Sequence, residues 1–149
     1  MSLRFLTHDL GYRDQIANVE DFLGTPVTAV LVDTAQVPDR ATENAYSAIS
    51  ANECSDVDYA QVALTGKTIA VEGDRVRFNC AKIDFGASVS ISARYLYLVF
   101  GTAGSLVAGD RILGHIDLTG TGNASSVSAE FSVTPPATGL FEVLRSNAP

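Results

Sequence analysis

The stretch Val89-Ser-Ile-Ser-Ala-Arg-Tyr-Leu-Tyr-Leu-Val-Phe100 decides the fold class of this 149-residue chain. Apolar residues alternate with polar residues along its first half, which predicts a β-strand with one face in a core. That face holds Val89, Ile91, Ala93, Tyr95, Tyr97 and Val99. Beyond Arg94 the opposite face also becomes apolar, so this half needs a second cover from a helix, another sheet or a neighbouring subunit.

Further short strands are expected on both sides of this stretch. Val27–Val32 is a β-branched run typical of a buried strand, and Arg75–Cys80 alternates with Cys80 predicted to point inward. The glycine of Thr65–Lys67 predicts a hairpin between strands at 61–64 and 68–71, and Glu72–Asp74 predicts another turn. The remaining strands are expected at 112–118, which pairs with the deciding stretch, at 129–133 and at 140–144.

One helix is predicted near the N-terminus, where Gly24 and Pro26 would end it. Its apolar residues recur at intervals of four, three and four: Tyr12, Ile16, Val19 and Leu23. The sequence therefore predicts a mainly β protein, an antiparallel β-sandwich or partly closed barrel with one short N-terminal helix. Residues 1–149 form a single domain in this prediction, and residues 1–7 form an extended N-terminal arm.

The segment Asp33–Asp58 has no sustained period and is predicted to be a long surface loop, a kind of loop that often carries function. Asp56 and Asp58 lack the spacing of a calcium loop and are interpreted as solvated acidic residues. Exposed Tyr46 or Tyr59 beside this loop would be the candidate surface of a carbohydrate-binding or receptor-binding module.

Composition excludes several classes of protein. The net charge of −7, from 17 acidic and 10 basic residues, disfavours nucleic acid as a partner. The longest apolar run, Tyr95–Phe100, is far shorter than the roughly 20 residues that cross a bilayer, and the N-terminal residues lack the pattern of a secretory signal. Cys54 and Cys80 lack a short metal-type spacing, and Cys80 is predicted to pack as a small apolar residue. Free thiols in a reducing cytoplasm are expected, with a Cys54–Cys80 disulfide as the less favoured alternative.

No catalytic, cofactor or metal site is predicted. A hydrolase would need a nucleophile, a base and an orienting group, and His8 and His115 are the only histidines. Neither lies in a known motif, and His115 is expected at the surface or rim of the sheet, opposite Ile116. Tyr95 and Tyr97 are expected in the core rather than on a binding platform. A small hydrolase based on the two histidines is the weakest functional alternative.

Several segments between Val27 and Leu118, about three-fifths of the chain, carry a family resemblance. They occur in this order: Val27–Asp33, Tyr59–Thr68, Val71–Asp74, Ala81–Asp84, Ser92–Leu98 and Leu113–Leu118. In that order the chain resembles the small virion proteins of tailed bacteriophages. The segment from Thr34 to Asp58 departs from the family pattern.

The resemblance implies a non-enzymatic structural protein of the virion, most plausibly a decoration or cement protein on the capsid surface. Its partners would be the major capsid protein and copies of itself, expected as a homotrimer, after synthesis in the bacterial cytoplasm. A tail or head-to-tail connector protein is the alternative. The apolar residues expected to form the interface are Leu3, Phe5, Leu6, Leu96, Leu98 and Phe100.

Overall fold

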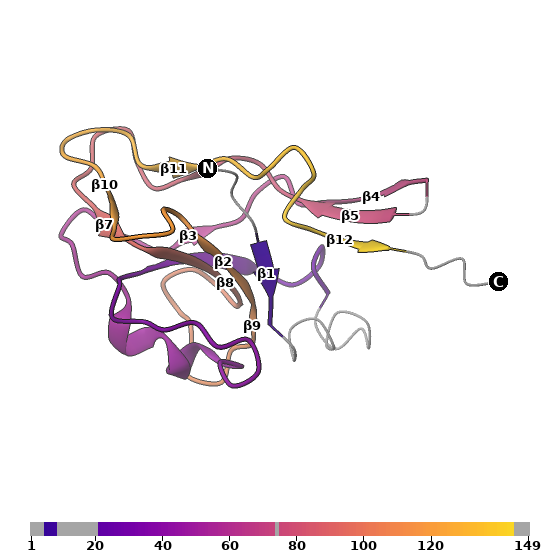
Figure 1. Ribbon diagram of the computed structural model, residues 1–149, viewed down its shortest axis with the longest axis horizontal. Coiled ribbons are helices and arrows are strands. Elements are labelled where there is room, and N and C mark those ends of the chain that lie inside the picture. Colours follow the sequence, from indigo (N-terminus) through magenta and orange to yellow (C-terminus); the bar gives the residue numbers. More distant parts are fainter. Residues whose placement is uncertain (1–4, 9–20, 74, 145–149) are drawn as a thin grey trace.

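The computed structural model describes residues 5–8, 21–73 and 75–144, and the fold is mainly β, as predicted (Figure 1). Its largest sheet has five antiparallel strands in the order β1-β9-β8-β2-β3. These strands are β1 (Phe5–Thr7), β2 (Val27–Val32), β3 (Val62–Ala63), β8 (Tyr95–Phe100) and β9 (Ile112–Asp117). Within the described residues no sheet closes into a barrel.

A three-stranded antiparallel sheet has the order β12-β5-β4 and extends away from the large sheet, on the right of Figure 1. Its strands are β4 (Thr68–Glu72), β5 (Arg75–Asn79) and β12 (Phe141–Leu144). Two strand pairs complete the fold, β6 with β11 and β7 with β10. They comprise β6 (Ile83–Asp84), β7 (Ser92–Ala93), β10 (Ala124–Ser125) and β11 (Ser132–Val133).

Both faces of the five-stranded sheet are covered by the chain itself. The first face contributes to the main core, which also contains Phe22, Ile83 and Phe131. The second face carries a smaller core of Val30, Val32, Ile49, Tyr97, Val99 and Ile112. Ile49 comes from the segment 33–58, which includes the 3-10 helices η1 (Tyr46–Ala48) and η2 (Ser50–Asn52). The predicted surface loop is therefore also the cover of the second face.

The deciding stretch does not form one continuous strand, because it is interrupted at Arg94 between β7 and β8. The Arg94 amide donates to Val32 O at 2.9 Å, and its carbonyl accepts from Leu118 N at 2.9 Å. One residue outside the alternation moves every later side chain to the opposite face. Ala93 consequently shares the main core with Leu96, whereas Tyr97 lies in the second core. The prediction that Ala93 and Tyr97 share a face is wrong.

Most of the predicted N-terminal helix falls on residues 9–20, outside the described residues. Its described end is a turn in which Thr25 N donates to Asp21 O at 2.7 Å. The predicted hairpin between 61–64 and 68–71 is wrong, since β3 pairs with β2 and β4 pairs with β5. The predicted turn after Glu72 joins β4 to β5, which pair as a hairpin, and the predicted hairpin of β8 with β9 is confirmed.

Candidate functional site

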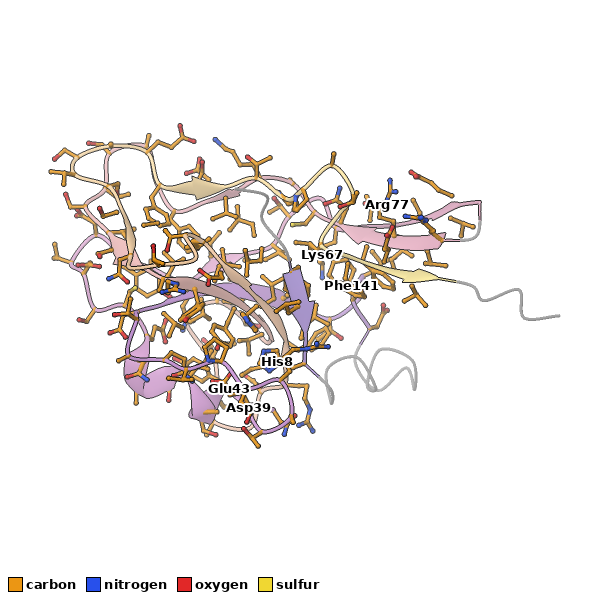
Figure 2. All side chains as sticks on the ribbon, in the orientation of Figure 1. His8, Asp39, Glu43, Lys67, Arg77 and Phe141 are labelled. Carbon is orange, nitrogen blue, oxygen red and sulfur yellow. The ribbon has the colours of Figure 1, made fainter. Side chains whose placement is uncertain are left out.

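The second face of the five-stranded sheet holds a buried pair of histidines. His8 follows β1 and is 0% exposed, and His115 lies in β9 and is 4% exposed. Pairing of β1 with β9 brings the two rings together, with His8 Nε2 2.9 Å from His115 Nδ1. The prediction that His115 lies at the surface is wrong, because segment 33–58 covers the face to which its side chain points. Figure 2 shows His8 beside Glu43 of that segment, below β1.

The contacts of the His8 ring fix where the protons lie. The backbone carbonyl of Glu43 lies 2.6 Å from His8 Nδ1, and because a carbonyl only accepts, Nδ1 carries the proton. In a neutral ring His8 Nε2 is then an acceptor, so His115 Nδ1 donates to it. Two protonated rings would point N–H groups at each other across 2.9 Å, so this geometry tolerates at most one positive charge.

A carboxylate and a phenol extend the network from the sheet into the covering segment. Tyr97 of β8 donates its hydroxyl to Glu43 Oε2 at 2.9 Å, and the amide of Gln36 donates to Glu43 Oε1. Asn52 Nδ2 donates to Gln36 Oε1 at 2.8 Å. Glu43 and Gln36 are both buried. These bonds join three points of segment 33–58 to each other and to the sheet.

Burial dominates the electrostatics of this network. It lowers the pKa of His115 to about 4 from the usual 6.5, with smaller contributions in the same direction from His8 and Arg40, while Asp117 opposes them. Burial, followed by the nearby Glu43 carboxylate, raises the pKa of Tyr97 well above its usual value. His115 is therefore neutral and Tyr97 protonated at pH 7. These hydrogen bonds hold segment 33–58 against the sheet. His115 gains a positive charge only when the pH falls towards 4.

Glu53 is the centre of a second polar cluster, which contains the two tyrosines predicted as a sugar-binding surface. Tyr46 donates to Glu53 Oε2, Tyr59 donates to Glu53 Oε1 at 2.6 Å, and Gln61 Nε2 donates to the same Oε1 at 3.0 Å. Burial and Glu53 raise the pKa of Tyr46 to about 12. Both tyrosines are half-buried, and Tyr59 packs against Phe85 with ring centroids 6.3 Å apart. They anchor the segment rather than offer exposed ring faces.

The two aspartates of this segment also serve internal contacts. Asp58 accepts from Ser90 N at 2.8 Å, and Asp56 accepts from Ser92 N at 3.0 Å. The interpretation of both as solvated residues is thus incomplete, because each holds the loop to the strand region before Arg94. No group of three or more potential metal ligands occurs in the described part of the chain.

The predicted interface residues lie mostly in the core. Leu96, Leu98 and Phe100 are at most 2% exposed, because β8 lies between β9 and β2 and both faces of the sheet are covered by the same chain. Phe5 is also a core residue. Leu6 is half-buried in β1, so the predicted arm is a strand of the chain's own sheet from residue 5, and Leu3 lies outside the described residues. The expected apolar surplus on β8 is therefore corrected.

Exposed apolar side chains occur instead on the three-stranded sheet. Cross-strand pairing aligns its apolar residues in two rows, Ile69 with Phe78 and Phe141, and Val71 with Val76 and Val143. In the first row the rings of Phe78 and Phe141 stack with their centroids 4.2 Å apart, and both rings contact the buried Phe22. The second row is more open, with Val71 70% exposed. The alternation of apolar and polar residues in 68–72 and 75–79 predicts two strands with one apolar face. It does not show whether that face is buried or exposed.

A pocket of about 290 Å³ lies beside β10 and β11. Its walls include Leu118, Phe131 and Val133, and the titratable group among its lining residues is Glu130. Lys82 Nζ donates to Glu130 at 2.5 Å, and Ser132 donates to it at 2.8 Å. The pocket is apolar, and its carboxylate is already bonded to neighbouring side chains.

No family model matches this chain. No curated protein and no solved structure matches it either. The resemblance to phage virion proteins therefore rests on the order of the sequence motifs alone. Cys54 and Cys80 are free thiols, as predicted, and burial raises the pKa of Cys80 to about 11. No helix in the described ranges is long and apolar enough to span a membrane.

Proposed function

We propose that this protein is a non-enzymatic structural component of a tailed-phage virion that decorates the head and stabilises it by bridging subunits of the major capsid protein. The observation that carries the proposal is the three-stranded sheet, whose apolar face is partly open beyond Phe78 and Phe141. A cement protein binds many identical sites through contact area, and an open apolar face is a suitable surface for it.

The use of the polar groups supports a structural role. Both ring nitrogens of His8 are engaged, and the carboxylate of Glu43 is held by Tyr97 and Gln36. Glu53 is held by two tyrosines and a glutamine. In these clusters the polar side chains satisfy one another and secure the loop, which favours a rigid binding scaffold over a reacting site.

The order of motifs from Val27 to Leu118 supports the phage assignment. A β-sandwich-like domain remains part of the proposal. The homotrimer at the threefold positions of the shell is the assembly that the phage resemblance implies, and the two-fold contact argued below is the alternative to it. The net charge of −7 suits a partner that is protein rather than nucleic acid. A tail or connector protein stays the alternative, since an apolar sheet face suits either position.

The proposal is tested on virions assembled with and without this chain. Particles that lack the protein should lose infectivity faster on heating or in low salt, and adding the purified protein back should restore resistance. Equal resistance of both particles would contradict cementing. Copy number separates the alternatives, because decoration requires on the order of hundreds of copies and a connector ring only about a dozen.

A further inference from the structure

β4 is a free edge of the three-stranded sheet. It pairs with β5 on one side and, among the described residues, has no strand on the other. All five of its side chains are exposed, including Ile69 at 39% and Val71 at 70%. An exposed strand edge with apolar side chains is a template for pairing with another strand.

The direction of the backbone groups along β4 follows from β5. The carbonyl of Phe78 accepts from Leu140 N at 2.8 Å, so the backbone polar groups of Phe78 point towards β12. Successive residues of a strand point their N–H and C=O groups to opposite sides, so Arg77 points towards β4 and pairs with Ala70. The N–H and C=O groups of Ile69 and Val71 therefore point outward from the sheet.

The geometry points to a two-fold pairing of β4 with β4 of a second copy, antiparallel and centred on Ala70. In this register Ile69 of each copy lies opposite Val71 of the other, and their outward N–H and C=O groups form four hydrogen bonds. The contact is isologous, because the same five residues supply both sides. Two three-stranded sheets become one six-stranded sheet.

The side chains of β4 suit this register. Ile69 and Val71 lie on the apolar face, so pairing places each beside an apolar neighbour and covers the most exposed part of the second row. On the other face Glu72 lies opposite Thr68 of the second copy, so no like charges meet directly. Arg77 Nη1 already holds Glu72 at 2.7 Å within each chain, which reduces repulsion between the two copies.

This contact does not depend on the phage assignment, but it competes with the expected homotrimer. The trimer is expected from the threefold positions of a capsid shell, and three of the residues assigned to its interface, Leu96, Leu98 and Phe100, are in the core. The exposed apolar strand edge is β4, and antiparallel pairing of a strand with itself closes at two copies. Failure of the two-fold contact would leave the proposed capsid role to its own test.

The test measures molar mass and amide exchange of the purified full chain over a range of concentrations. We expect two chain masses by light scattering, and slower amide exchange at Ile69 and Val71 as concentration rises. The amide of Ala70 is paired with β5 in every state and serves as the internal reference. A monomer at all concentrations, a trimer, or a dimer in which the amides of Ile69 and Val71 exchange as fast as in the monomer would overturn the pairing.

A matched pair of variants locates the contact. Val71→Lys places a charge beside the apolar neighbour and should return the protein to one chain mass. Val57→Lys makes the same change at a valine that is 97% exposed and outside the strands, and should leave the dimer intact. Circular dichroism should show both variants folded, since each valine is on the surface. A dimer that survives Val71→Lys, or that Val57→Lys also breaks, would contradict this interface.

Discussion

β8 and β4 both carry apolar side chains but lie in opposite environments. β8 is apolar along its whole length and β4 contains Ile69 and Val71, yet Leu96 to Phe100 of β8 are buried and every side chain of β4 is exposed. β8 has β9 and β2 as neighbours and cores on both faces, whereas β4 lies at the edge of a small sheet. Ile69 and Val71 therefore show that an apolar side chain in a strand is buried only where neighbouring strands and a covering layer surround it.

The five-stranded and three-stranded sheets also differ in what covers them. Residues 33–58 cover the five-stranded sheet and are held to it by the hydrogen bonds of His8, Glu43 and Tyr97. The polar face of the three-stranded sheet has exposed ion pairs instead, such as Arg75 with Glu142 at 2.9 Å. Exposed pairs of this kind contribute little to stability, so the two regions should respond very differently to substitution.

The largest expected contrast comes from shortening an apolar side chain in each strand. Leu98→Ala leaves a cavity in the main core and should lower the free energy of unfolding by about 3–4 kcal/mol. Val71→Ala removes a side chain that is 70% exposed and should change it by less than about 0.5 kcal/mol. Urea unfolding at a concentration where the protein is monomeric measures both. Similar losses would show that β4 also belongs to the core.

Acid should weaken the covered region specifically. The folded pKa of His115 is about 4 against 6.5 in the unfolded chain, so the unfolded chain binds more protons between these values. The difference between the two pKa values adds to the free energy of unfolding, and this addition is fully present above pH 6.5. It is lost as the pH falls towards 4 and amounts to roughly 3 kcal/mol at most.

The measurement for this prediction is urea unfolding at pH 7, 6 and 5, for the wild type and for His115→Gln. The wild type should lose stability on acidification more steeply than the variant, in which the titrating imidazole is absent. His8 and Arg40 lower the pKa of His115 and Asp117 raises it, and all three residues are retained in the variant. Equal slopes would show that His115 does not carry the effect.

Removing one hydroxyl from the buried network should have an intermediate effect. Tyr97→Phe takes a hydrogen bond from the buried Glu43 carboxylate and should cost about 2 kcal/mol. Tyr95→Phe is the control on the same strand, because Tyr95 is only half-buried and should cost much less. Thermal unfolding followed by circular dichroism separates the two. If both variants lose the same stability, the hydrogen bond from Tyr97 to Glu43 does not contribute to the stability of the fold.

The smallest expected contrast uses two threonines. Thr28 in β2 is 0% exposed and donates to Gly101 O at 2.7 Å, so Thr28→Val should cost about 1 kcal/mol by leaving that carbonyl without its partner. Thr68→Val in the exposed β4 should be close to neutral. Urea midpoints compare them, and a larger loss for Thr68→Val would reverse the distinction between the strands.

Local features of the chain were predictable from the sequence. Period-two alternation identifies strands because it reflects only the geometry of consecutive residues, and it placed Cys80 inward, where it is 8% exposed. Gly73, with φ of +62°, marks the β4 to β5 turn since glycine adopts that conformation without strain. The mainly β class follows from the same local rules.

The candidate sites, by contrast, depend on contacts between distant residues. His8 and His115 meet although 107 positions separate them, and nothing in either local sequence announces a partner. Arg94 changes the face of the deciding stretch because it bonds to Val32 and Leu118, which belong to other parts of the chain. The sequence by itself determined the mainly β class and several strands and turns. Only the tertiary structure decided which faces are buried, because strand order and covering loops are set by long-range pairing.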